Sequence, residues 1–246
     1  MKVFYHLGNY CMFMGQVFKR PEKIRIYRQQ IGREIDSLGL GSLGIVVLIS
    51  LFMGAVITIQ TASGIDSAWI PRYAIGFATR ESVILELSPT IIALILAGKV
   101  GSNVASEIGT MRVSEQIDAL EIMGVNSAGY LVMPKVVAAV LINPILVAIS
   151  MSFAIAGGYL AGSMSNVVTG DDFIYGIQYD FDPFNVTYAF IKTVVFAFLI
   201  TSISAYHGYH TRGGALEVGQ SSTRAVVYSS VAILISNYVI TQLLLI

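Results

Sequence analysis

Five separate stretches of this chain are each long and apolar enough to cross a lipid bilayer, and they constrain the fold more than any other feature. They cover about residues 39–61, 82–105, 131–164, 187–206 and 225–246. A helix needs roughly 20 mostly apolar residues to cross a hydrocarbon core of ~30 Å. Lipid offers no hydrogen-bond partners to the backbone, so such stretches fold as α-helices. We therefore expect an all-α polytopic membrane protein, with residues 1–246 forming one transmembrane domain.

The composition agrees with this expectation and excludes other classes. Hydrophobic residues make up 55% of the chain and charged residues only 12%, with 15 basic and 15 acidic side chains. A disordered chain would be polar and highly charged. A nucleic-acid-binding protein would carry a basic excess, so we expect no nucleic-acid partner. The lone Cys11 cannot support a disulfide framework.

The net charge of zero is a sum of regions with opposite charge, and their placement predicts the orientation. Alternate connections hold most of the basic residues, whereas the connection over about 165–186 holds only acidic ones. Basic loops stay on the cytoplasmic side, so the N-terminus should be cytoplasmic and the C-terminus periplasmic. The twelve basic residues on the cytoplasmic side are Lys2, Lys19, Arg20, Lys23, Arg25, Arg28, Arg33, Lys99, Arg112, Lys135, Arg212 and Arg224, against Arg72, Arg80 and Lys192 on the other side.

The N-terminal region, residues 1–37, has apolar residues at helical spacing rather than one continuous apolar run. This pattern favours an amphipathic helix that lies in the membrane interface and ends at Pro21. The alternative is a water-soluble helical hairpin packed on the cytoplasmic face. A signal peptide is not expected, because neither its apolar core nor a small-residue cleavage site is present.

Residues 107–124 form the most unusual connection. Val113, Ile117 and Leu120 recur at helical spacing, and Gly124 is placed to end a helix. Acidic residues lie together on another side of this predicted helix, at positions Glu115, Asp118 and Glu121. A short helix with exposed acidic and apolar residues suits docking to another protein, although it could equally fold back on its own bundle.

Glu86 is the most informative single residue. It lies within the second apolar stretch, three residues before Pro89. A charged group near the middle of a membrane-spanning helix costs about 2.5–3.5 kcal/mol on insertion scales. We expect Glu86 to face a cavity, a partner group or the bundle interior, unless it lies near enough to the interface to reach water.

Small residues recur every fourth position in two spans, at 97, 101, 105 and 109 and at 154, 158 and 162. Such stripes allow helices to approach closely, and packing within the chain is favoured over a dimer seam. His207 and His210 have no third metal-type ligand nearby, so a solvated loop is the better interpretation. We find no phosphate loop, metal-binding motif or catalytic arrangement typical of an enzyme.

Two stretches carry a family resemblance. Residues 86–138 begin ELSPTIIALILAGKVGSN and continue through EIGTMRVSEQIDALEIMGVN, and residues 207–230 read HGYHTRGGALEVGQSSTRAVVYSS. They resemble the MlaE/YrbE permeases, which are the membrane subunits of ABC transporters associated with MCE-domain proteins. Leu85 is a departure from the resemblance, because it stands where the family usually has arginine.

The resemblance implies a homodimer of five-span subunits in the bacterial inner membrane. An ABC ATPase subunit, which binds the ATP and Mg, would sit beneath it, and an MCE-domain protein would sit on the periplasmic side. Residues 107–124 would be the coupling helix that fits the ATPase, with contacts from Arg112, Glu115, Gln116, Asp118, Ala119 and Glu121. Phospholipid would occupy a cavity between the two copies, with contacts expected at Met53, Val56, Gln60, Glu86 and Thr90.

The sequence therefore favours a non-enzymatic permease subunit that binds no cofactor itself and moves phospholipid or a related lipid between the inner membrane and the outer envelope. One alternative is an ATP-independent secondary transporter or channel. That class should show inverted repeats or paired charges within the membrane, and the sequence alone reveals neither. A membrane-embedded lipid enzyme would need clustered acids or histidines near a membrane face, which are also lacking.

Overall fold

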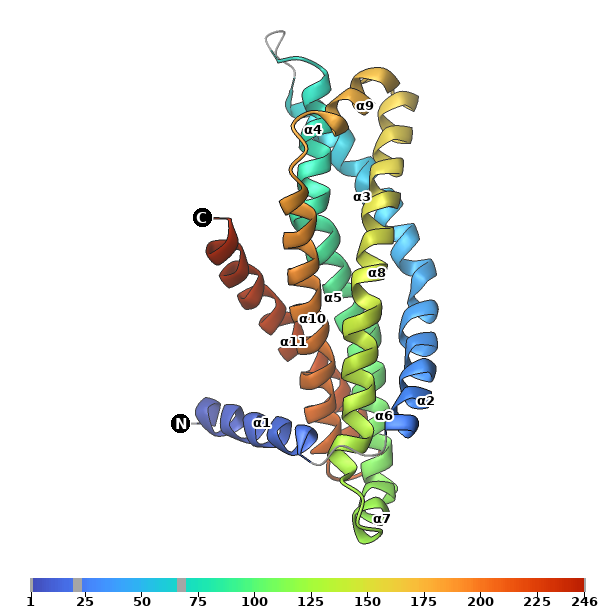
Figure 1. Ribbon diagram of the computed structural model, residues 1–246, viewed down its shortest axis with the longest axis vertical. Helices are drawn as coiled ribbons and strands as arrows, with labels where there is room; N and C mark the ends of the chain where they lie inside the picture. The colour runs from blue at the N-terminus through green and yellow to red at the C-terminus, as the bar shows by residue number, and fades with distance from the viewer. Residues whose placement is uncertain (1, 20–23, 66–69, 246) are drawn as a thin grey trace. The chain divides into compact units, whose positions relative to one another are not determined.

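The computed structural model describes residues 2–19, 24–65 and 70–245, which are almost entirely helical and contain no strand (Figure 1). Pro21, predicted to end the first helix, lies outside the described residues. In chain order the elements are α1 (Lys2–Phe18), α2 (Ile24–Glu34), η1 (Ile35–Leu40), α3 (Gly41–Gly64), α4 (Tyr73–Ser82), η2 (Val83–Ile91), α5 (Ile92–Leu96), η3 (Ala97–Gly101), α6 (Ser102–Val113), α7 (Gln116–Ile122), α8 (Ser127–Met164), α9 (Gly170–Gln178), α10 (Pro183–Tyr209) and α11 (Ala215–Leu244). The three η elements are π-helical.

The predicted membrane spans are confirmed as helices. Within the described residues, five continuous helical runs are long and apolar enough to cross a membrane, namely Tyr27–Gly64, Tyr73–Val113, Ser127–Met164, Pro183–Tyr209 and Ala215–Leu244. Each run begins before the corresponding predicted span. Hydropathy detects only the segment that lies in hydrocarbon, whereas backbone hydrogen bonding extends a helix into the more polar residues beside it.

The chain divides into two compact units. Unit 1 contains Met1–Gly41, Ala93–Asn143 and Val194–Ile246, and unit 2 contains Ser42–Ile92 and Pro144–Thr193. Each unit is therefore built from parts of several helical runs that are distant from one another in the sequence.

In unit 1, the first small-residue stripe packs against other helices of the same chain. A Cβ atom added at Gly101 would lie 2.9 Å from Ser204 Oγ, and one at Gly109 would lie 3.3 Å from Val218. Ala97 and Ala105 are fully buried. This confirms the predicted packing within the chain, because α6 and η3 approach α10 and α11 at distances that larger side chains would prevent.

Helix α1 also belongs to unit 1 and is attached to the last turns of α10. The Tyr10 hydroxyl lies 2.7 Å from Ser202 Oγ, and Phe13 packs edge-on against Tyr206 with ring centroids 5.8 Å apart. Val17 is almost fully buried. The helix that was predicted from its amphipathic pattern is thus present, and its location in the membrane interface stays a prediction.

In unit 2, the second small-residue stripe faces α3. A Cβ atom at Gly54 would overlap the Ala154 carbonyl, and one at Gly157 would overlap the Leu51 carbonyl. A buried chain of hydroxyls runs beside this contact, from Ser50 to Ser150 at 2.8 Å and from Ser150 to Ser88 at 3.1 Å. Close packing and internal hydrogen bonding therefore join α3, α8 and η2 without exposing polar groups to lipid.

Candidate functional site

Glu86 has a charged partner within unit 2. Its carboxylate Oε2 lies 2.7 Å from Lys192 Nζ of α10. The Lys192 side chain is fully buried, whereas the Glu86 side chain is 46% exposed. The pair therefore holds one buried cation and presents a carboxylate at the surface of the unit. This confirms the expectation that Glu86 faces a partner group.

Further contacts orient both members of this pair. Thr90 donates a hydrogen bond of 2.9 Å to Glu86 Oε1. Lys192 Nζ also donates to the Leu85 carbonyl at 3.1 Å and lies 4.5 Å from the centre of the Tyr188 ring. Two of the predicted lipid contacts, Glu86 and Thr90, are thus brought together, and the Lys192 charge receives the several partners that a buried ion needs.

The local backbone beside this pair is unusual. Pro89 lies inside the π-helical segment Val83–Ile91. The Leu85 carbonyl, to which Lys192 donates, belongs to the same segment. Short π-helical segments of this kind are often found at functional sites.

Lys192 was not among the residues that we predicted for the site. A signal was available, because it is the lone lysine within the fourth span, and a charge in a span needs a partner. The pair also corrects the argument against a secondary transporter. Paired charges within a span do exist in this chain, so their supposed absence cannot exclude that class.

The structure does not bring the three predicted contacts on α3 to this pair. The buried face of α3 runs through Ser42, Val46, Ser50, Gly54, Thr58 and Ala62. Val56 is 60% exposed, Gln60 is exposed and Met53 is half-buried. No described hydrogen bond or ion pair joins them to Glu86, and their role in binding lipid stays a prediction.

A second buried cation in unit 2, Arg80, lies at the end of α4. Its guanidinium donates to the carbonyls of Ile177 at 2.7 Å, Tyr179 at 2.8 Å and Asp180 at 3.2 Å. It also forms an ion pair of 2.6 Å with Glu81. The C-terminus of a helix carries partial negative charge, so Arg80 fixes the end of α9 against α4.

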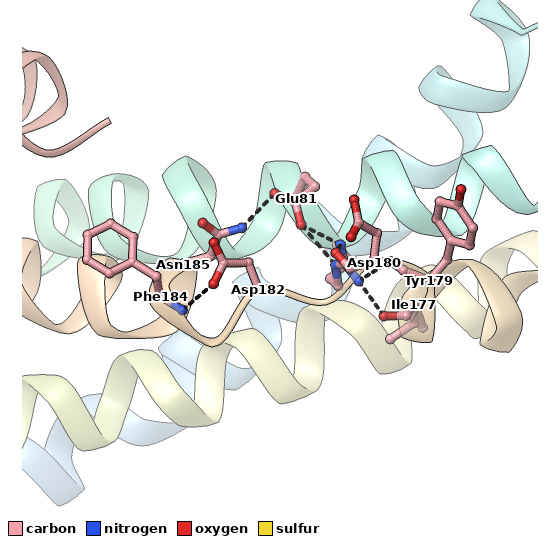
Figure 2. A network of polar contacts seen from close by, with 8 residues as sticks. Glu81, Ile177, Tyr179, Asp180, Asp182, Phe184 and Asn185 are labelled. Carbon is pink, nitrogen blue, oxygen red and sulfur yellow. Dashed lines mark hydrogen bonds and ion pairs between the residues drawn. The ribbon is translucent and has the colours of Figure 1, made fainter. Parts of the chain in front are cut away.

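Glu81 extends this network toward the beginning of α10. Asn185 donates to Glu81 at 3.0 Å, and the Phe184 amide donates to Asp182 at 2.9 Å (Figure 2). A hollow of about 470 Å³ lies beside these residues. From the sequence we counted Arg80 only among the charges of a loop. Its acceptors are backbone carbonyls nearly 100 residues away, and no sequence pattern indicates such a contact.

The predicted coupling helix over 107–124 is corrected in unit 1. It consists of the end of α6 and the separate helix α7, with a turn at Ser114 and Glu115 between them. Glu115 adopts a left-handed conformation with φ of 59°, which interrupts a helix. Gly124, with φ of 79°, follows the helix end as predicted, because glycine tolerates this conformation.

Several predicted docking residues contact their own chain. Arg112 pairs with Asp118 at 2.5 Å across the turn, and Glu121 accepts hydrogen bonds from Ser127 and Tyr209, each at 2.9 Å. The three acids therefore do not form one free face. Glu115, Gln116 and Ala119 are exposed.

Two strongly exposed side chains of this region are apolar and were missed by the prediction. Ile122 is 87% exposed and Met123 is 68% exposed. Ile117, by contrast, is fully buried. The signal was present in the sequence as two apolar residues directly before Gly124, at positions that the helical stripe does not bury.

Lys135 on α8 forms ion pairs with two other helices of unit 1. Its buried ammonium lies 2.6 Å from Glu34 of α2 and 2.7 Å from Glu107 of α6. One cation thus joins three helices, and it anchors the beginning of the segment that leads to α7.

The long apolar helical runs of the described residues are those of a multi-pass membrane protein. The comparisons specify this class further. The family model described as "Permease MlaE" matches residues 31–243. The chain is 39% identical over 237 residues to a "Probable ABC transporter permease protein" of Rickettsia bellii, covering 96% of this chain and 91% of that protein.

Two other relatives widen the range of organisms. A probable ABC transporter permease protein of Synechocystis is 36% identical and covers 94% of this chain and 87% of its own length. The chloroplastic protein TRIGALACTOSYLDIACYLGLYCEROL 1 of Arabidopsis thaliana is 34% identical and covers 93% of this chain and 65% of its own length. The chain belongs to the MlaE permease family.

Proposed function

We propose that this chain is the permease subunit of an ABC-type transporter that moves phospholipid or a related lipid between the bacterial inner membrane and the outer envelope. The family match over residues 31–243 carries the proposal, because it includes the Glu86–Lys192 pair and α7. The name of the Arabidopsis relative contains that of a glycolipid, which supports a lipid as the transported molecule.

The proposed assembly contains two copies of this chain, a separate ABC ATPase and a periplasmic MCE-domain protein. ATP and Mg bind to the ATPase and not to this chain. The N-terminus is cytoplasmic, so α7 faces the ATPase, and the C-terminus is periplasmic. The distribution of basic residues supports this orientation.

The contacts of α7 support a mechanical role in this assembly. Its exposed side chains Ile122 and Met123 are available to a partner. Glu121 of the same helix accepts hydrogen bonds from Ser127 at the beginning of α8 and from Tyr209 at the end of α10. A force on α7 is therefore transmitted to two spanning helices through short hydrogen bonds. Lipid moves only if its affinity differs between the two resulting states of the cavity.

Glu86 would set the polarity of the lipid cavity. Its carboxylate is held by Lys192 and Thr90 and remains 46% exposed. A fixed charge of this kind is expensive in an apolar span and marks a transport pathway more often than a structural contact. It suits the polar part of a lipid, while exposed apolar residues such as Val56 suit the acyl chains.

Substitutions on α7 test the ATPase contact. We expect Ile122→Asp with Met123→Asp to abolish copurification of the ABC ATPase with the tagged chain, because the buried apolar contact would receive two charges. Leu216→Asp is the matched control, since Leu216 is 72% exposed on α11 and lies outside α7. Wild-type copurification of the α7 variant would overturn the docking assignment. Reversing Asp118 or Glu121 is a poorer test, because it also breaks contacts within the chain.

One observation favours a second candidate, the ATP-independent transporter. The Glu86–Lys192 ion pair at 2.7 Å is a feature of that class. Lipid movement by the purified native complex in the absence of ATP would favour it, whereas movement that requires ATP hydrolysis would favour the ABC mechanism.

A further inference from the structure

A pocket of about 760 Å³ lies in unit 1, among α1, the last turns of α10 and the first half of α11. It is separate from the Glu86 site, which belongs entirely to unit 2. Its lining includes two arginines, Arg212 in the loop after α10 and Arg224 on α11, and the apolar residues Leu199, Ile203 and Ala232, which lie further into the two helices. None of these five residues was assigned a function above.

The two arginines have no acidic partner among the described residues. Both are exposed, and the ion pairs of the described chain involve other cations. The pocket contains one acid, Glu217, whose carboxylate accepts the Gly214 amide at 2.7 Å. The lining therefore carries more positive than negative charge, which favours an anion, and guanidinium groups bind phosphate with matching geometry.

The dimensions of the pocket match one leaflet of a bilayer. Along α10, the wall extends from Leu199 to beyond Tyr206. At 1.5 Å per residue, the ten steps from Leu199 to the helix end at Tyr209 cover ~15 Å. This is half of a hydrocarbon core of ~30 Å. A ligand that fills the pocket would have an anionic head at the loop after α10 and an apolar tail directed into the span.

The aromatic wall of this pocket is held in place by packing. His207 stacks on Tyr228 with ring centroids 5.1 Å apart and an angle of 11°, and His210 packs on Tyr206 at 4.5 Å. His207 therefore lines the pocket from α10 and not from a solvated loop as predicted, whereas His210 lies in the turn after α10 and is exposed.

Helix α1 closes one side of the pocket through Tyr10. Ser202 already donates to the Phe198 carbonyl at 2.6 Å, so the Tyr10 hydroxyl donates to Ser202. Burial raises the pKa of Tyr10, which keeps this donor protonated.

We propose that this pocket binds an anionic phospholipid of the cytoplasmic leaflet. Arg212 and Arg224 contact the phosphate, and the acyl chain lies along Leu199, Ile203 and Ala232. This site is additional to the transported lipid. Its assignment to the cytoplasmic leaflet rests on the orientation proposed above, whereas binding itself is tested on the purified chain and not by movement of lipid.

The experiment measures lipid binding to the delipidated full chain in detergent by native mass spectrometry. The probes are phosphatidylglycerol and phosphatidylcholine with identical short acyl chains, together with inorganic phosphate as competitor. We expect the wild type to bind phosphatidylglycerol at least tenfold more tightly than phosphatidylcholine. Equal affinity for the two lipids would overturn the proposal. Displacement of phosphatidylglycerol by an equal concentration of inorganic phosphate would assign the site to a soluble anion and also overturn it.

Variants separate the two ends of the pocket. Arg212→Gln with Arg224→Gln should lower phosphatidylglycerol affinity at least tenfold, and the corresponding double change to lysine should lower it less, because it keeps the charge but loses the planar fork. Ala232→Trp should fill the apolar end and weaken both lipids. Arg28→Gln with Arg33→Gln is the matched control, since both arginines are exposed on α2. Wild-type affinity in the Arg212/Arg224 glutamine variant, or an equal loss in the control, would refute the assignment.

Discussion

Removing Glu86 should lower the free energy of unfolding more than removing its partner Lys192, because the two side chains are buried to different extents. Lys192 is fully buried and Glu86 is 46% exposed. In Glu86→Gln the buried ammonium loses its counter-ion, and breaking a buried pair in this way costs about 3–5 kcal/mol. We expect the lower end of this range, because Lys192 keeps the Leu85 carbonyl and the Tyr188 ring as partners.

Lys192→Met should cost much less. The carboxylate of Glu86 is half-exposed and keeps the hydrogen bond from Thr90, so only a partly solvated charge loses its partner. We expect a loss of about 1 kcal/mol, which is the net value of a typical hydrogen bond. The double variant Glu86→Gln with Lys192→Met removes both charges and should recover about 2 kcal/mol relative to Glu86→Gln alone.

The assay is unfolding of the purified chain by SDS titration in mixed micelles, followed by circular dichroism. The four proteins form a double-mutant cycle, whose coupling energy isolates the pair. Our reasoning predicts a coupling of about 3 kcal/mol and a larger loss for the Glu86 variant. If the effects of the two single variants were additive, or if Lys192→Met lost more stability than Glu86→Gln, the reasoning that Lys192 is the buried charge and needs Glu86 as its counter-ion would be refuted.

Three further substitutions test other parts of the structure by the same unfolding measurement. Gly54→Ala should lower the free energy of unfolding by about 3 kcal/mol, because its Cβ would overlap the Ala154 carbonyl. The control is Gly44→Ala on the same helix, whose Cβ meets nothing within 4 Å and which should be neutral or slightly stabilising. Equal effects of the two substitutions would contradict the close approach of α3 and α8. Arg80→Lys should lower the free energy of unfolding by about 3 kcal/mol although it keeps the charge, because an ammonium lacks the planar fork that bonds Glu81 and three carbonyls together. A loss below 1 kcal/mol would contradict the role of Arg80 in holding the end of α9 against α4. Gly124→Ala has open space around its Cβ and should cost about 1 kcal/mol through the left-handed backbone alone, so an unchanged midpoint would contradict the turn after α7.

The membrane spans could be predicted because the signal is local. A run of apolar residues dictates a helix whatever its neighbours are, and all five runs are helical in the described chain. Gly124 was predicted for a similar reason, since glycine is the residue that most easily adopts a positive φ. The turn at Glu115 could not be predicted, because a non-glycine residue in this conformation is uncommon and depends on the surrounding contacts, including the Arg112–Asp118 pair.

Within the candidate site, the sequence identified the charge but not its partner. Glu86 stood out because it is isolated in an apolar stretch. Lys192 lies 106 residues further along the chain, and only the packing of α10 on η2 brings the two together. For the same reason, the acids of residues 107–124 looked like one free face, whereas Glu121 bonds to Tyr209, 88 residues away. Long-range pairing of this kind is a property of the fold and leaves no periodic pattern in the sequence.

The central claim, that this chain conducts lipid under the control of a partner ATPase, is tested most directly by lipid transfer from the native complex. The complex is purified through a tag on this chain, reconstituted into vesicles with an acyl-labelled phospholipid, and followed with ATP, without ATP and with a non-hydrolysable ATP analogue. Our account predicts movement of the labelled lipid only when ATP is hydrolysed, with a marked decrease for Glu86→Gln with Lys192→Met. Movement at the same rate in all three conditions, or no movement in any of them, would contradict it.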